Sequence, residues 1–510
     1  MLPVLARPCP DSVEPGCYGA LPDPEEPLRT MSTTFLRDGR ALAVLAVPLI
    51  LTQLAQVALT TTDTVMMGLL GTEELAAGGL AIVVFNQVRT MGVGLVTAVG
   101  NQVAAAAARA ERAADEAATT APGTADTGGI ESGAAGAARE EVRGVVRAAM
   151  AVATGAGLVG AVLLLAVGQA LPLLGQDHEV AHRAQHMLAA LAPGLLPCLW
   201  FQVVRQFTVG MRRPQALLHI TVASVAVNAG LNWTLVHGTW ILPEAGLVGI
   251  GAATSGVYLL TFIALYAVAR RDRELAPLLA LNPTKADRAT VRRLVALGVP
   301  IAATYGSEAG FFFVTALMAG SFGPAALAAH TAVNQLVYIV FQVAVGLSHA
   351  ASINVSRELA LGDHARARRL MRTALGCAAC VMAAVGVVYL AVPHLVLAPF
   401  LDSGSEDALT IATRLLIVAA ALQFFDCAQN IGVGLLRGLD DTRTGFRVTL
   451  VGYWAIGLPA SCLFAFGFGA DTLGLWLGLL TGLAATAALL LRAFTAALDR
   501  RTGGAAVAAA

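Results

Sequence analysis

The chain has 510 residues, of which 57% are hydrophobic and only 13% are charged, and its formal net charge is zero. Soluble proteins carry about 25% charged residues, so this composition excludes an ordinary soluble enzyme or binding domain. We therefore expect the lipid bilayer to surround most of the chain, and we expect no nucleic-acid partner.

Residues 1–40 precede the first long apolar stretch and are rich in proline near their start. They contain neither the long apolar core nor the charged leader of a signal peptide, so we predict a disordered cytoplasmic tail. The sequence changes to an ordinary helix approach at Met31, which makes Met31 an alternative start.

From residue 41 onward, apolar stretches of about 20 residues or more follow one another, and each is long enough to cross a bilayer as a helix. We place them near 41–64, 75–102, 147–167, 187–210, 214–236, 246–269, 293–317, 325–350, 373–397, 409–436, 446–468 and 472–493. This pattern predicts an all-α integral membrane protein with about twelve transmembrane helices.

A polar segment at 271–292 divides these stretches into two groups of about six. We therefore expect an N-lobe at 41–270 and a C-lobe at 293–493, joined by a cytoplasmic linker, with a cytoplasmic tail at 494–510. Within the N-lobe, residues 113–138 are rich in Ala, Gly and Thr, and we expect a flexible cytoplasmic insertion there.

Basic residues gather in alternate loops. Arg212 and Arg213 lie in one such loop and Arg368 and Arg369 in another, whereas the loops of the opposite side carry only Arg183. Basic loops of membrane proteins face the cytoplasm. We therefore predict a multi-pass protein of the inner (plasma) membrane with both termini in the cytoplasm.

The two groups of helices are related by an internal repeat. Residues 45–77 align without gaps to residues 297–329, and the alignment matches Pro48 to Pro300. Six helices per half is an even number, so both halves have the same orientation. We predict two six-helix lobes related by a pseudo-two-fold axis along the membrane normal, with substrate sites between them.

The repeat fails at its acidic residues. Asp63 aligns with Thr315 and Glu308 aligns with Gln56, while a third acid, Asp426, lies in the tenth stretch. A charge at the bilayer centre costs about 2.5–3.5 kcal/mol on insertion scales, so such residues usually mark an ion or substrate path. We expect all three acids to exchange a proton or a sodium ion, with Glu308 and Asp426 as candidate Na⁺ ligands.

Polar residues share helical faces with these acids, because the members of each run, such as Gln53, Gln56, Thr60 and Asp63, follow one another at steps of three or four. They are Gln53, Gln56, Tyr305, Gln423 and Asn430. One interpretation is that they join helices by hydrogen bonds. The other, which we adopt as a hypothesis, is that they line the substrate cavity.

Arg89 lies in the middle of the second stretch and is a fourth intramembrane charge. It either forms a structural ion pair with one of the acids or has a functional role, which is to hold a carboxylate ionised or to contact an anionic part of a substrate. Both interpretations stay open from the sequence.

Three segments carry a resemblance to a known family. LAVPLILTQLAQVALTTTDTVMMGLLGTEELAA at 45–77 resembles the opening of the multidrug and toxic compound extrusion (MATE) family, and FFDCAQNIGVGLLRGLDDTR at 424–443 resembles its tenth helix. VNAGLNWTLVHGTWILPEAGLVGIGAATS at 227–255 is similar to the NorM-like branch. The likeness covers about 41–492, although Arg89 and the insertion at 113–138 depart from the family pattern.

The resemblance implies an antiporter that exports cationic, often amphipathic organic compounds in exchange for Na⁺ or H⁺ by alternating access of two lobes. It also implies that Asp63 is the acid of the first lobe and that Glu308 and Asp426 are the acids of the second. Asn228 and Asn232 match an N-x-x-x-N pattern of the NorM-like branch and either line the cavity or pack helices.

We expect the incoming ion and the outgoing small organic substrate to compete for the acids, with no cofactor other than the ion and with the chain acting as a monomer. No GxxxxGK[ST] phosphate loop occurs, which argues against an ATP-driven pump, and neither HExxH nor GxSxG supports an intramembrane enzyme. The alternative is a flippase for a lipid-linked precursor or a natural product, which would require several cationic residues in the cavity.

Overall fold

The structure is a computed structural model that describes residues 26–120, 128–174, 178–238, 244–401 and 406–508. In this part of the chain, 12 helical segments are long and apolar enough to cross a membrane, which confirms the expected number. No strand occurs among the described residues.

Helices α1 to α8 supply six of these segments. Their bounds are α1 Glu26–Leu70, α2 Thr72–Thr97, α3 Val99–Thr120, α4 Gly128–Ala170, α5 His178–Leu191, α6 Leu195–Gly210, α7 Gln215–His237 and α8 Gly246–Arg271. Two segments are interrupted: α2 continues into α3 after Ala98, and α5 continues into α6 through a short 3₁₀ turn, Ala192–Gly194.

Helices α9 to α16 supply the other six. Their bounds are α9 Arg288–Gly320, α10 Pro324–Leu361, α11 His364–Ala391, α12 Pro393–Leu397, α13 Glu406–Gly438, α14 Thr442–Leu450, α15 Leu458–Cys462 and α16 Asp471–Ala508. The segment that contains α14 and α15 includes two π-helical stretches, Val451–Gly457 and Leu463–Gly467.

Helix extends further than the sequence predicted. Of the tail at 1–40, residues from Glu26 onward are helical, and the rest lies outside the described residues. The expected flexible insertion at 113–138 is helical in α3 and α4 except for 121–127, which are also outside the described residues. Alanine is the strongest helix former, and Arg112 pairs with Glu116 at i,i+4, so this segment continues both helices beyond the apolar stretches.

The two lobes meet where α1 packs on α10 and α2 packs on α9. Because the repeat makes α1 equivalent to α9 and α2 equivalent to α10, these two contacts exchange under a two-fold axis, as the sequence predicted. Glycines bring the backbones together: a Cβ on Gly298 would lie 2.2 Å from the carbonyl oxygen of Leu95, and one on Gly346 would lie 2.8 Å from the backbone nitrogen of Ile50.

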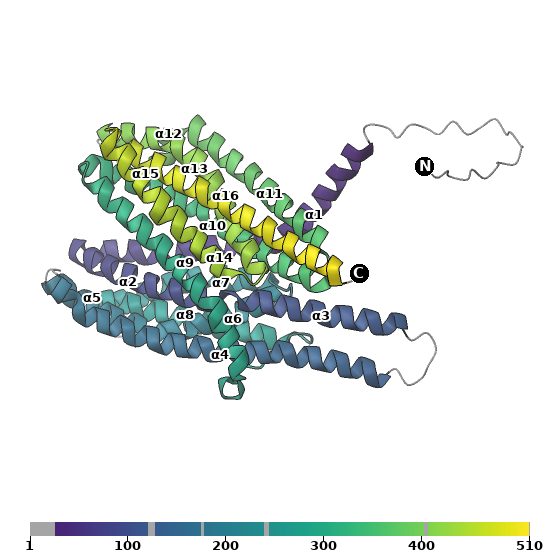
Figure 1. The fold of residues 1–510 in the computed structure, drawn as a ribbon. Helices are drawn as coiled ribbons and strands as arrows, with labels where there is room; N and C mark the ends of the chain where they lie inside the picture. The colour runs from purple at the N-terminus through teal and green to yellow at the C-terminus, as the bar shows by residue number, and fades with distance from the viewer. Residues whose placement is uncertain (1–25, 121–127, 175–177, 239–243, 402–405, 509–510) are drawn as a thin grey trace, which may run out of the picture.

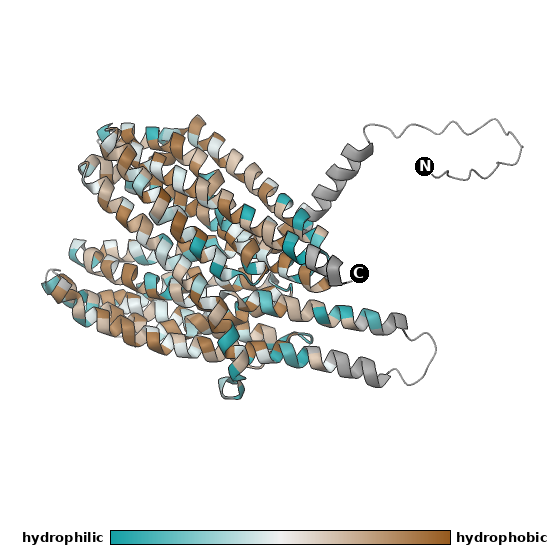
Figure 2. Cartoon of the chain, viewed as in Figure 1, coloured by the Kyte–Doolittle hydropathy of each residue, from teal (hydrophilic) through white to brown (hydrophobic). Residues whose placement is uncertain are grey.

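The lobes lie close together at the end that carries the two termini, and their ribbons diverge toward the opposite end (Figure 1). Hydrophobic residues cover most of the helical surface, whereas hydrophilic residues gather at the terminal end and on the projecting parts of α3 and α4 (Figure 2). This distribution is the one expected for a protein whose sides face lipid.

Candidate functional site

In the N-lobe, Asp63 of α1 is surrounded by three polar side chains. Asn228 and Asn232 of α7 each donate from Nδ2 to Asp63 Oδ1 at 2.7 Å, and Thr254 of α8 donates from Oγ1 to Asp63 Oδ2 at 3.0 Å. All four residues are buried. The four-residue spacing of the asparagines places both amides on one face of α7, directed at the acid.

Both asparagines also leave their amide oxygen, Oδ1, buried without a hydrogen-bond partner in the described structure. A half-turn about the terminal torsion exchanges the amide nitrogen and oxygen. Two amide oxygens, one hydroxyl and one carboxylate would then surround the position next to Asp63, which is the oxygen-rich set that hard cations prefer. The same carboxylate accepts three hydrogen bonds when no cation is present.

In the C-lobe, Glu308 of α9 and Asp426 of α13 form a second acidic site. Tyr453 donates from Oη to Glu308 Oε1 at 3.3 Å, and its ring stacks on Phe311 with centroids 4.9 Å apart. Gln429 donates from Nε2 to Asp426 Oδ1 at 3.4 Å. Asp426 is only 3% exposed and Glu308 is half-buried, so in this apolar surrounding each carboxylate favours a bound proton or cation.

Asn430 extends this second site, because its Nδ2 lies 3.4 Å from Asp426 Oδ1 and 3.2 Å from the Asp426 carbonyl oxygen. In the described ranges, no three His, Cys, Asp or Glu side chains lie close enough together to hold a metal ion. A sodium ion at Glu308 and Asp426 would therefore need amide or hydroxyl oxygens as further ligands.

Two of the other candidates lie where the lobes meet. Gln53 of α1 donates from Nε2 to Gln342 Oε1 of α10 at 3.4 Å. Tyr305 of α9 packs on α2, where a Cβ on Gly94 would lie 3.2 Å from its ring. These residues form part of the contact between the lobes.

The remaining two candidates take no part in the acidic sites. Gln56 is half-buried on α1. Gln423 is buried on α13, one turn before Asp426, and it donates no hydrogen bond to either C-lobe acid in the described structure. Neither residue therefore forms a hydrogen bond to an acid in the described structure.

Arg89 on α2 forms no ion pair with a carboxylate of the described residues, so the structural ion pair considered above is not present there. Its Nε donates to Asn86 Oδ1 at 3.2 Å, and its guanidinium lies near Tyr258 and Cys198. It therefore remains a positive charge without a nearby acid in this part of the structure.

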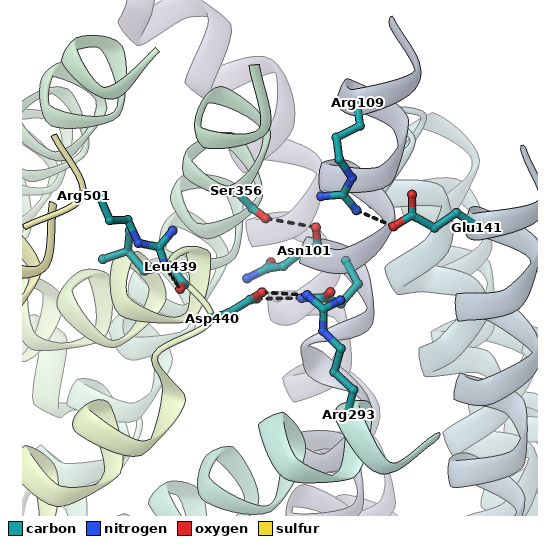
Figure 3. A network of polar contacts seen from close by, with 9 residues as sticks. Asn101, Arg109, Glu141, Arg293, Ser356, Leu439, Asp440 and Arg501 are labelled. Atoms are coloured by element: carbon teal, nitrogen blue, oxygen red, sulfur yellow. Dashed lines mark hydrogen bonds and ion pairs between the residues drawn. The ribbon is translucent and has the colours of Figure 1, made fainter. Parts of the chain in front are cut away.

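The side-chain contacts that join the lobes form a polar seam at the terminal end. Gln102 of α3 donates from Nε2 to Asp440 Oδ1 at 2.6 Å, and within the C-lobe Arg293 of α9 binds the other oxygen of Asp440, Oδ2, at 3.2 Å. Asn101 donates from Nδ2 to Ser352 Oγ at 2.8 Å and accepts from Ser356 Oγ on its carbonyl oxygen at 3.0 Å. Figure 3 shows Asn101, Ser356, Asp440 and Arg293 converging between the lobes.

One further pair continues the seam toward the projecting end of α3, where Arg357 donates from Nη1 to Glu111 Oε1 at 3.0 Å. With the bond between Gln53 and Gln342, these are the lobe-joining side-chain hydrogen bonds in the described part of the chain. The structure is therefore a state in which the lobes are joined at the terminal end, and Asp63 lies toward the opposite end of its helix.

The MatE family model matches residues 48–121, 130–234 and 300–463. The chain belongs to the MATE family of transporters. This confirms the resemblance seen in the sequence and favours a transporter over the alternative of a lipid-linked precursor flippase.

Curated relatives cover nearly the whole MATE chain. It is 37% identical over 468 residues to the probable multidrug resistance protein NorM of Pseudomonas aeruginosa, covering 91% of this chain and 90% of that protein. It is 33% identical over 471 residues to the NorM of Pseudomonas syringae pv. tomato, covering 91% and 96%.

Solved MATE structures share the fold. One, described as an outward-facing conformation of a multidrug resistance MATE family transporter, matches with a TM-score of 0.77 at 16% identity, covering 91% of this chain and 96% of that one. The eukaryotic MATE transporter AtDTX14 matches with a TM-score of 0.75 at 20% identity, covering 91% and 98%. The two-lobed all-helical architecture predicted from the sequence is thereby confirmed.

The structure adds site residues that the sequence analysis missed. Thr254, Gln429 and Tyr453 contact the acids, but such residue types are common in membrane helices and gave no distinct signal. Arg205 on α6 gave a signal that was overlooked, since it is a charge inside an apolar stretch. It is only 3% exposed, and it donates to Gln53 Oε1 at 2.9 Å.

Proposed function

We propose that this MATE transporter exports cationic or amphipathic organic compounds in exchange for Na⁺ or H⁺. The proposal draws its substrate class from the multidrug resistance relatives and its coupling from the two acidic sites. The observation that carries it is the arrangement at Asp63, where a buried carboxylate, two amides and a hydroxyl from three helices converge.

Competition at the acids explains exchange without a nucleotide. An ion that enters from the side opposite the polar seam neutralises a carboxylate, which removes the charge that holds a cationic substrate. One charge crossing 100 mV supplies about 2.3 kcal/mol, so each coupled ion supports a substrate gradient of roughly 50-fold.

Asp63 is the coupling residue of the N-lobe in this mechanism, and Asn228 and Asn232 change their amide orientation when a cation replaces a proton. Glu308 and Asp426 act together in the C-lobe, because two neighbouring carboxylates in an apolar surrounding bind a shared proton or a cation. Cations prefer carboxylate and amide oxygens, so both sites suit Na⁺ as well as H⁺.

Alternating access in this proposal consists of breaking the polar seam and closing the opposite end. The excess of arginine in the loops near the termini supports a cytoplasmic location for that end. The substrate then enters from the cytoplasm when the seam is open, where Gln53, Tyr305 and Arg89 contribute to the cavity together with Gln56. Gln423 and Asn430 line its C-lobe side, and one chain acting as a monomer completes the path.

Transport by purified protein in liposomes tests this function. Ethidium movement driven by an imposed Na⁺ or H⁺ gradient is expected, and Asp63→Asn, Glu308→Gln and Asp426→Asn should each abolish gradient-driven movement. Asp407→Asn is the matched control, because Asp407 is an exposed acid on the same helix as Asp426. Normal coupling in all three site variants would refute the proposal.

A further inference from the structure

A basic cavity lies between α11 and α16, outside the contact between the lobes. It has a volume of about 370 Å³, and α11 lines it with His364, Arg368, Arg369 and Arg372 while α16 contributes Leu498 and Thr502. No acid is among the described residues that line it. The cavity is thus an electropositive hollow in the side of the C-lobe.

The spacing of the lining residues explains why they share one cavity. His364, Arg368 and Arg372 follow at steps of four on α11, and Leu498 and Thr502 are four apart on α16, so each helix presents a single stripe. Steps of four rise about 6 Å, so the basic stripe extends about 12 Å along α11. An ion pair between Arg368 and Asp499 ties the two helices together beside the cavity.

The cavity lies where both helices leave the apolar part of the protein. α11 begins at His364 with basic residues and becomes apolar after Thr373, and the candidate span of α16 ends at Thr502. Figure 1 shows the start of α11 and the end of α16 at the terminal end of the molecule, and Figure 2 shows hydrophilic residues there. This is the level expected for the lipid headgroups of one leaflet.

We propose that this cavity binds the phosphate headgroup of an anionic phospholipid from the leaflet on the terminal side. Arginine guanidinium groups bind phosphate oxygens in a two-pronged geometry. The cavity is large enough to hold a headgroup between the helices rather than on a flat surface.

A lipid fits better than a soluble phosphate compound because of what lies beyond the cavity on α11. Further along the same face of this helix, 15 and 18 residues beyond Arg372, Val387 and Leu390 are exposed at 65% and 57%. An occupant with a phosphate at the basic stripe and acyl chains along these two residues would cover both surfaces. A free phosphate would cover only the first.

Lipid binding by the purified full-length protein tests the proposal, and it needs no transport activity. Native mass spectrometry or fluorescence titration should show phosphatidylglycerol binding more tightly than phosphatidylcholine. Each surface arginine contributes about a fivefold gain in affinity for anionic lipid, so Arg369→Gln with Arg372→Gln should weaken binding of phosphatidylglycerol about 10- to 30-fold.

Two further variants separate this cavity from general attraction to charge. Arg271→Gln with Arg273→Gln removes two exposed arginines at the end of α8, on the same side of the protein, and should leave the tight binding unchanged. Ala365→Trp fills the cavity without altering its charge, because Ala365 also lines it, and should weaken binding as strongly as the loss of both arginines.

The proposal is overturned if the α8 control loses as much affinity as the cavity pair, or if Ala365→Trp binds normally. It is also overturned if inorganic phosphate or glycerol 3-phosphate binds as tightly as the lipid, because the occupant would then be a soluble anion. Thermal unfolding of each variant in detergent verifies that a loss of binding is not a loss of fold.

Discussion

Replacing Asp440 by asparagine removes one negative charge from the polar seam while keeping the shape of the side chain. Asp440 has φ of 61°, in the left-handed region that asparagine adopts more readily than most residues, so the backbone should not change. The seam loses the charged acceptor for Gln102 of the N-lobe and the ion-pair partner of Arg293. We expect the joined state of the lobes to become less favourable.

The magnitude follows from the contact with Gln102. This hydrogen bond, whose donor residue is only 4% exposed, weakens from a charged to a neutral acceptor, a loss of about 1–1.5 kcal/mol. The ion pair with Arg293 lies within the C-lobe, so its loss does not change the balance between the joined and the open state. A loss of about 1–1.5 kcal/mol shifts the equilibrium roughly 5- to 13-fold toward the state that is open at the terminal end.

The assay is double electron–electron resonance, which measures the distance between two spin labels. Labels at Arg139 on α4 and Arg443 on α14, both exposed, report the separation of the lobes in a background with the seven native cysteines replaced. Asp441→Asn is the matched control, since Asp441 caps α14 by accepting from the Thr444 amide and does not join the lobes. Equal distance distributions in Asp440→Asn and the control would refute the role of the seam.

Three other substitutions follow from the same structure. Thr254→Val removes one donor to Asp63 and should weaken coupling-ion binding about 2- to 10-fold in a titration of ion-dependent transport, whereas Thr261→Val, whose hydroxyl bonds only to backbone carbonyls, should not. Gly298→Ala places a Cβ against the Leu95 carbonyl and should lower the free energy of unfolding by about 1–3 kcal/mol, unlike Gly310→Ala, where the nearest atom is 3.5 Å away. Gln53→Leu leaves the buried Arg205 guanidinium without one acceptor and should lower the melting temperature of the protein. Gln56→Leu on the same helix should have little effect. Equal melting temperatures of the two variants would contradict this role of Arg205.

Much of the fold could be predicted because long apolar stretches and a gapless repeat are local properties of the sequence. The helical extension of α3 and α4 could not be, since glycine and threonine near 121–127 obscured the alanine-rich segments on both sides. Asp63 could be selected from the cost of burying a charge. Its contact with Asn228 and Asn232 depends on the packing of α1 against α7, which no local pattern specifies.

The partners in the polar seam could not be predicted from the sequence either. Asp440 lies within the LRGLDDTR segment, so its family pattern was visible, but the sequence did not indicate that its partner is Gln102, more than 300 residues earlier. Arg205 was visible as an intramembrane charge. Its role depends on Gln53 of another helix, and only the folded chain brings the two side chains together.

The failure of the repeat at the acids gives the two sites different depths. Asp63 aligns with Thr315, which is seven residues beyond Glu308 on α9. The Thr315 hydroxyl donates a hydrogen bond to the carbonyl oxygen of Phe312. Seven residues correspond to about 10 Å along a helix, so in the common frame of the two lobes Asp63 lies closer to the end opposite the polar seam. In the proposed exchange, an ion entering from that end meets Asp63 first, and an ion bound at Glu308 has crossed more of the membrane potential. The two acidic sites are therefore not interchangeable, and exchanging the residues of one lobe for those of the other should alter the voltage dependence of transport.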